Sequence, residues 1–137
     1  MTSQQHPKIL VIDDDPVVCH LLEKRLHAAH GYEVTTALDG RSGLARIKED
    51  RPDLIVLDIL IPDMSGGEIA RALKNDPETR DIPIVFISVI LDQKGKKRID
   101  IDGDLHRAVS KPIYQPELLS AIRKTLNEFN HGQGDPE

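Results

Sequence analysis

The run Leu54-Ile55-Val56-Leu57, followed directly by Asp58, decides the expected fold of this chain. Two more runs of the same kind are Ile9-Leu10-Val11-Ile12 and Ile84-Val85-Phe86-Ile87. A short run that is apolar at every position is typical of a strand buried on both faces, which occurs in the middle of a parallel sheet with helices above and below it. The sequence therefore predicts three central strands of a parallel sheet.

Two weaker segments complete the predicted sheet. Tyr32–Thr36 is half-polar, which suits an edge strand, and Leu105–Ser110 carries His106 and Arg107 inside it. Between the strands, apolar residues recur at helical spacing in four segments: Val17–Leu26, Leu44–Ile47, Ile69–Leu73 and Leu118–Leu126. Five strands that alternate with helices give a doubly wound α/β sheet with helices on both faces.

The segment from Ile90 to Gly103 interrupts this alternation. It contains Gly95 and a short basic run and has no good apolar stripe, so we expect a weak or irregular helix, or a loop. At the two ends of the chain, residues 1–7 and 130–137 are polar. We expect them to be tails on either side of a domain over residues 8–129.

Length, charge and cysteine content limit the class of protein. At 137 residues the chain has room for one domain of ordinary size. Its 23 acidic residues against 18 basic ones give a net charge of −5, which argues against a general nucleic-acid binder. The single cysteine, Cys19, excludes an internal disulfide framework and a cysteine-rich zinc site. Because no signal peptide or membrane-length apolar stretch is found, we expect a cytoplasmic protein without membrane contact.

Chemically active side chains follow the inner strands of the predicted sheet. In an open α/β sheet, ligands bind beyond the carboxyl ends of the strands, so the residues after each strand are candidates for a site. The first strand is followed by Asp13, Asp14 and Asp15, the third by Asp58, the fourth by Ser88 and the fifth by Lys111-Pro112. Four strand ends would thus bring carboxylates, a hydroxyl and an ammonium group to one edge of the sheet.

These residue types together suit the transfer of a phosphoryl group. Carboxylates within a few ångströms repel one another, and a hard cation such as Mg²⁺ relieves that repulsion. A carboxylate can also attack phosphorus to form an acyl phosphate, whose oxygens then need the positive charge of Lys111 and the hydroxyl of Ser88. Asp15 precedes Pro16 and is more simply explained as a helix N-cap. The peptide bond before Pro112 is one that can adopt the cis form.

Four motifs make the chain resemble the receiver domain of bacterial two-component response regulators, over about Lys8 to Glu128. They are Ile9-Leu-Val-Ile-Asp-Asp-Asp-Pro16, Pro52-Asp-Leu-Ile-Val-Leu-Asp-Ile-Leu-Ile-Pro-Asp-Met-Ser-Gly66, Ile82-Pro-Ile-Val-Phe-Ile-Ser88 and Ser110-Lys-Pro-Ile113. The resemblance implies a flavodoxin-like, five-stranded parallel sheet in the order 2-1-3-4-5. It also implies a phosphoprotein of a two-component or phosphorelay system. We expect the single-domain form, because the length leaves no room for a fused output domain.

The same resemblance implies roles for the residues at the strand ends. Asp58 would be the phosphoacceptor and would take a phosphoryl group from a partner histidine kinase or histidine phosphotransfer protein. Mg²⁺ would be held by Asp13, Asp14, Asp58 and the backbone carbonyl of Leu60. Ser88 and Lys111 would contact the phosphoryl oxygens. The phosphorylated domain would then signal by contact with a downstream protein or pass the phosphoryl group on, without turning over a small molecule.

The chain departs from the family pattern at positions that concern the readout of phosphorylation. Ala108 stands where the family usually has the switch tyrosine or phenylalanine, and Val89 stands where a smaller residue usually follows the serine. The usual alanine-rich fourth helix is missing from residues 92–102. Leu60 and Ile90 occupy positions that influence the access of water to the acyl phosphate, and both are apolar. We therefore predict slow self-dephosphorylation.

Two other functions compete with the receiver interpretation. A haloacid-dehalogenase-like phosphohydrolase would use Asp13 in the run Asp13–Val17, with Ser88 and Lys111 as its second and third motifs. The chain lacks the acidic pair that such an enzyme should have after the lysine, and this interpretation leaves Asp58 without a role. A receiver-like module that binds partners without phosphorylation is the second alternative, and the altered readout positions favour it slightly.

Overall fold

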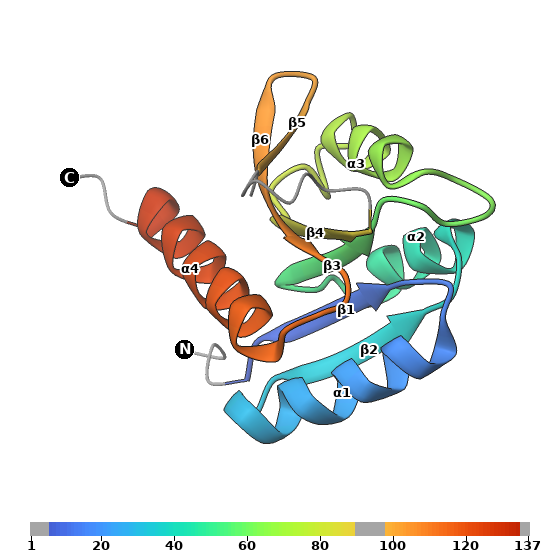
Figure 1. Cartoon of the computed structure of the whole chain (residues 1–137). Coiled ribbons are helices and arrows are strands. Elements are labelled where there is room, and N and C mark those ends of the chain that lie inside the picture. The colour runs from blue at the N-terminus through green and yellow to red at the C-terminus, as the bar shows by residue number, and fades with distance from the viewer. Residues whose placement is uncertain (1–5, 90–97, 135–137) are drawn as a thin grey trace.

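The computed structural model describes residues 6–89 and 98–134, and side chains as far as residue 128. Within these ranges strands and helices alternate as far as the fourth strand (Figure 1). The elements are β1 (Lys8–Ile12), α1 (Pro16–His30), β2 (Glu33–Ala37), α2 (Gly40–Glu49), β3 (Leu54–Asp58), α3 (Gly66–Lys74), β4 (Ile84–Ser88), β5 (Arg98–Ile101), β6 (Asp104–Ser110) and α4 (Gln115–Gly134). The five predicted strands and the four predicted helical segments are all present.

The strands form one sheet in the order β2-β1-β3-β4-β6-β5. The first five in this order are parallel, and they reproduce the predicted order 2-1-3-4-5 because β6 is the predicted fifth strand. The sixth strand, β5, pairs with β6 in the antiparallel direction. The prediction of a purely parallel five-stranded sheet is therefore correct for the five strands it named and wrong about the strand count.

The extra strand lies where a weak or irregular fourth helix was expected. Residues 90–97 are outside the described part of the chain, but Arg98–Ile101 is a strand and not a helix. Arg98 and Asp100 alternate with the half-buried Ile99 and Ile101, which is the period of a strand. The turn Asp102–Gly103 follows, and both residues have positive φ angles, 52° and 94°. This is the requirement of the two-residue turn that joins antiparallel strands.

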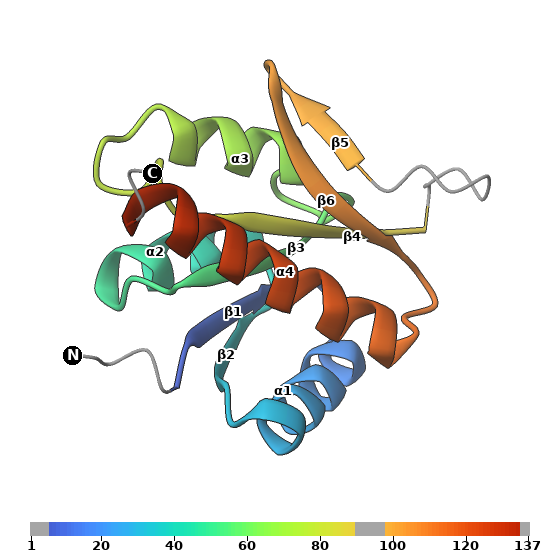
Figure 2. The same cartoon turned by 90° about the vertical axis from the view of Figure 1, so that its left-hand side faces the viewer.

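Helices cover both faces of the sheet, so each buried strand contributes side chains to two hydrophobic cores. In β1, Ile9 and Val11 pack with α1 and α4, whereas Leu10 and Ile12 pack with α2 and α3. Figures 1 and 2 show α1 and α4 on one side of the sheet and α2 and α3 on the other. Strands that are apolar at every position are stable only in this arrangement, because either face would otherwise be exposed to water.

The helix ends follow local sequence signals. The Asp15 side chain accepts a hydrogen bond from the Val17 amide at 2.9 Å and is the N-cap of α1, as predicted. Gly31 ends α1 in the left-handed conformation at φ 70°. At the other end of the chain, α4 continues to Gly134, past the boundary at residue 129 predicted for the domain.

Gly66, the first residue of α3, packs against the end of β3 with no room for a side chain. A Cβ atom there would lie 2.8 Å from the Ile59 Cα and 2.9 Å from the Asp58 carbonyl oxygen, both backbone atoms. At the neighbouring Gly67 the nearest atom is the Ile101 Cδ1 at 3.7 Å, an ordinary contact distance. The absent side chain at Gly66 therefore lets α3 begin directly beside Asp58.

We predict that Gly66→Ala lowers the free energy of unfolding by about 2 kcal/mol, the usual cost of forcing a methyl group into a packed site. Gly67→Ala is the matched control. It should be neutral or slightly stabilising, because alanine is a better helix former than glycine. Urea unfolding at neutral pH measures both. Equal effects of the two substitutions would contradict the close packing of Gly66.

Candidate functional site

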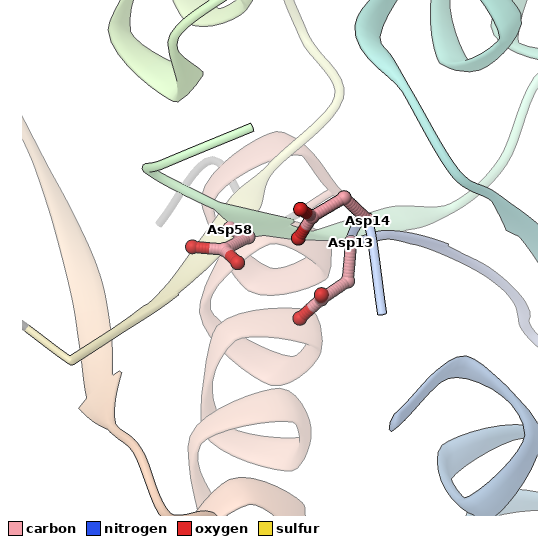
Figure 3. Close-up of side chains that lie close together, drawn as sticks. All are labelled: Asp13, Asp14 and Asp58. Carbon is pink, nitrogen blue, oxygen red and sulfur yellow. The ribbon is translucent and has the colours of Figure 1, made fainter. Parts of the chain in front are cut away.

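Three aspartates gather at the carboxyl end of the sheet (Figure 3). Asp13 and Asp14 follow β1, and Asp58 is the last residue of β3. One carboxylate oxygen of each lies within 4.8 Å of those of the other two. Asp13 and Asp58 are buried, at 0% and 4% exposure, whereas Asp14 is exposed. The structure thus brings together the three carboxylates that the strand ends predicted.

The Lys111 ammonium bridges the two buried carboxylates. Its Nζ lies 2.8 Å from Asp13 Oδ2 and 2.9 Å from Asp58 Oδ2. Burial alone would lower the pKa of Lys111, but its hydrogen bonds and its attraction to Asp13 and Asp58 outweigh burial and raise the pKa above its ordinary value. The side chain is therefore a fixed positive charge between two negative ones at neutral pH.

The other oxygens of the buried carboxylates are held by nearby backbone amides. Asp13 Oδ1 accepts from the Asp15 amide at 2.9 Å, and Asp58 Oδ1 accepts from the Leu60 amide at 3.0 Å. Asp13 Oδ2 is fully buried and contacts the Lys111 ammonium at 2.8 Å. A buried carboxylate oxygen with spare capacity beside two more carboxylates fits a hard divalent cation, which takes oxygen ligands.

Ser88 and Lys111 reach this edge from the neighbouring strands. In the sheet register, Asp58 of β3 lies beside Ile87 of β4, so Ser88 is one residue beyond the position level with Asp58. Ser88 in turn lies beside Ser110 of β6, so Lys111 is one residue beyond the position level with Ser88. Ser88 is fully buried. The Lys111 amide donates to the Ser88 carbonyl at 2.9 Å, which fixes the chain at the start of the loop after β6. The Lys111–Pro112 bond is cis, as the sequence allowed.

The remaining predicted positions lie around this cluster. Leu60, two residues after Asp58, is 51% exposed, and the proposed use of its carbonyl as a ligand stays a prediction. Val89 is exposed beyond the end of β4. Ala108 is buried opposite Phe86 in the core under α2 and α3. Thus an aromatic ring does lie beside the position of the missing switch residue, but on the neighbouring strand.

The loop between Asp58 and α3 is held by contacts that no sequence pattern singles out. Asp63 accepts hydrogen bonds from the Gly40 and Arg41 amides at 2.8 and 3.0 Å, and these bonds lower the pKa of its carboxyl. The Gly66 amide donates to the Ile59 carbonyl at 2.8 Å. Because Asp63 is far in sequence from α2, its role as an anchor of that helix appears only in the folded chain.

Cys19 of α1 contacts the backbone of the site residue Asp13. The buried thiol donates to the Asp13 carbonyl at 3.3 Å. Burial, and secondarily the charge of Asp13, raises the pKa of the thiol to about 11, so it is protonated at neutral pH and acts as a donor. The thiol thus contacts the backbone at the strand end that carries Asp13.

Comparison with known proteins identifies the family. A family model described as the response regulator receiver domain matches residues 9–123. The chain belongs to the response regulator receiver family. The receiver domain is a module of two-component signalling, and nothing in the comparisons supports a phosphohydrolase better.

Individual relatives agree with this assignment. The chain is 40% identical over 122 residues to the response regulator PleD of Caulobacter vibrioides. The matched region covers 89% of this chain but only 26% of PleD. It is 34% identical over 122 residues to the polar-differentiation response regulator DivK of Brucella anthropi, covering 89% of this chain and 98% of DivK. Thus the receiver spans about a quarter of one relative and nearly all of the other.

The solved structures show the same fold. The chemotaxis protein CheY4 of Vibrio cholerae is 27% identical, with a TM-score of 0.75, over 88% of this chain and 98% of CheY4. Within the described residues, no helix is both long and apolar enough to cross a membrane. The flavodoxin-like α/β fold implied by the sequence motifs is confirmed.

We predict that Lys111→Met lowers the free energy of unfolding by roughly 2–4 kcal/mol in the presence of EDTA. It leaves two buried carboxylates without their shared cation, the situation in which breaking a buried ion pair is most costly. Saturating Mg²⁺ should recover most of this loss, because the cation replaces the missing charge. Urea unfolding in EDTA and in Mg²⁺ measures both effects.

The control for this substitution is Lys8→Met. Lys8 pairs with Asp50 at 2.6 Å, but both side chains are largely exposed, so its removal should change the free energy of unfolding far less than the removal of Lys111. If the two variants were equally stable in EDTA, Lys111 would not be the counter-ion on which the buried carboxylates depend.

Proposed function

We propose that Asp58 is the phosphoacceptor of this receiver and takes its phosphoryl group from a histidine kinase or a histidine phosphotransfer protein. The observation that supports the proposal is the buried cluster in which Lys111 Nζ lies within 2.9 Å of both Asp13 and Asp58. It supplies a carboxylate nucleophile and a fixed positive charge within reach of one another. A structural cluster without chemistry would have little reason to keep three carboxylates together.

In the proposed transfer, a carboxylate oxygen of Asp58 forms a bond to phosphorus as the bond between phosphorus and the donor nitrogen breaks. The electron pair of that bond stays with the imidazole, which takes up a proton. The Leu60 amide, 3.0 Å from Asp58 Oδ1, orients the carboxylate. Lys111 then exchanges its contact with Asp58 for a contact with the phosphoryl oxygens, and the hydroxyl of Ser88 donates to the same group.

The proposed metal is Mg²⁺, held by Asp13, Asp14, Asp58 and the carbonyl of Leu60. When bound, the cation neutralises charge on the phosphoryl oxygens during transfer. The Asp14 carboxylate is exposed and can contact the cation in place of water, whereas burial fixes the carboxylates of Asp13 and Asp58. The cluster of the three carboxylates supports this assignment, as does the buried Asp13 Oδ2 with spare capacity.

The proposed output is contact with a downstream protein or onward transfer of the phosphoryl group, in a cytoplasmic signalling pathway and without turnover of a small molecule. Ala108 leaves the usual switch position without an aromatic ring, so the readout must use other residues. Retained binding of a partner by Asp58→Ala would favour the alternative, a receiver-like module that works without phosphorylation.

We predict that the wild-type chain gains the mass of one phosphoryl group when it is incubated with acetyl phosphate and Mg²⁺. Asp58→Ala should gain none, because it lacks the nucleophile. Asp81→Ala removes an exposed aspartate away from the cluster and should behave like the wild type. Intact mass spectrometry measures all three, and phosphorylation of Asp58→Ala to the wild-type level would contradict the proposal.

We also predict a long-lived acyl phosphate. Leu60 is half-exposed beside the acceptor and cannot orient a water molecule by hydrogen bonding. The other position behind this prediction, Ile90, lies outside the described residues. Leu60→Asn should shorten the lifetime severalfold, and Leu60→Met, the matched apolar control, should not. The decay of phosphorylated protein in Mg²⁺ without a phosphatase tests this, and rapid decay of the wild type would contradict it.

A further inference from the structure

One of the two edges of the sheet is formed by β5, a strand that the five-stranded prediction did not include. Among the residues that the structure describes, it is the last strand in the sheet order and pairs with β6 alone, and Figures 1 and 2 show the β5–β6 hairpin projecting beyond the rest of the sheet. An edge strand presents unpaired backbone groups that can bind another strand. The question is which strand fits this edge.

The hairpin turn determines which backbone groups are unpaired. The two-residue loop Asp102–Gly103 makes Ile101 and Asp104 the pair that closes the hairpin. Antiparallel strands alternate between bonded and non-bonded pairs, so Ile101 and Ile99 bond toward β6. The N–H and C=O groups of Arg98 and Asp100 are therefore the ones directed toward the free edge.

The side chains of these two residues carry opposite charges and lie on the same face. Ile99 and Ile101 pack against the core under α2 and α3, which leaves Arg98 and Asp100 on the face that carries α4. Both are exposed. A strand that offers an acidic and a basic side chain at alternate positions on its matching face would therefore complement this edge best.

Arg98 lies in an electrostatically unfavourable place within one copy of the chain. It stands directly opposite Arg107 in the ladder, and like charges opposite one another destabilise a sheet. Glu128 is close enough to feel the charge of Arg98, but its two carboxylate oxygens accept hydrogen bonds from Arg107 at 2.8 and 2.6 Å. Among the described residues no carboxylate forms an ion pair with Arg98. The Arg98 guanidinium therefore has no carboxylate in direct contact among the described residues, and a bound strand could supply one.

We propose that the β5 edge binds the β5 edge of a second copy of this chain, antiparallel and centred on Ile99. In this register Arg98 of each copy lies opposite Asp100 of the other, which gives two opposite-charge pairs and four backbone hydrogen bonds. A register centred on Arg98 would oppose two arginines, and one centred on Asp100 would oppose two aspartates. Charge and backbone direction thus select the same symmetric pairing, and the two copies form one continuous sheet.

The predicted dimer is weak and depends on concentration and salt. One short strand per copy buries far less than the roughly 1,200 Å² at the lower end of stable interfaces. The charge pairs are exposed, so salt screens them. The proposal does not depend on phosphorylation of Asp58, because none of the residues at this edge belongs to the cluster of carboxylates.

The test is sedimentation velocity of the full chain from micromolar to millimolar concentration, in low and high salt. We expect a monomer–dimer equilibrium for the wild type and a dissociation constant roughly tenfold higher for Arg98→Asp, which places two aspartates opposite one another. The double variant Arg98→Asp with Asp100→Arg restores opposite charges and should restore self-association relative to Arg98→Asp. Lys24→Asp, a charge change at an exposed position of α1, should behave like the wild type.

A second variant and a second measurement separate pairing from folding. Asp100→Asn keeps an oxygen for the Gly103 amide, which now bonds Asp100 Oδ1 at 2.7 Å, but it loses the charge and should weaken the dimer. In the wild type, the amide signals of Arg98 and Asp100 should shift with concentration in a nuclear magnetic resonance titration. A wild type that stays monomeric at millimolar concentration, or an Arg98→Asp variant that associates equally well, would overturn the proposal.

Discussion

The rest of the site depends on the ion pairs of Lys111 with Asp13 and Asp58. Two carboxylates with exposures of 0% and 4% are costly to bury side by side, and the ammonium at 2.8 and 2.9 Å makes that burial tolerable. The contacts come from three different strand ends, so the ion pairs also hold together the edge of the sheet at which we propose the phosphoryl transfer. The same ammonium can then serve a phosphoryl group, because it is positively charged at neutral pH.

The sheet explains why these groups meet. Parallel strands deliver their carboxyl ends to one edge, and strands that are apolar on both faces must lie inside a three-layer arrangement. Gly66 and Asp63 then fix the loop after Asp58, one by leaving room for the backbone and the other by binding the amides at the start of α2. Stability and function thus share the same residues at this edge.

Much of the fold and the cluster could be predicted because each depends on a local signal. Apolar runs mark the inner strands, and the residues after them mark the site. The β5 strand was missed because it is only four residues long, although the alternation of Ile99 and Ile101 with charged residues and the Asp102–Gly103 turn were usable signals. The anchoring role of Asp63 could not be predicted, because it depends on contact between segments far apart in sequence. The position of Phe86 beside Ala108 likewise follows only from the register of β4 and β6.

The most direct test of the central claim is to locate the acyl phosphate after reaction with a small phosphodonor and Mg²⁺. Reduction with borohydride converts a phosphorylated aspartate into homoserine, and peptide mass spectrometry then identifies its position. The receiver mechanism proposed here predicts homoserine at position 58 and at no other aspartate of the cluster. Homoserine at position 13, as a phosphohydrolase would give, would contradict it.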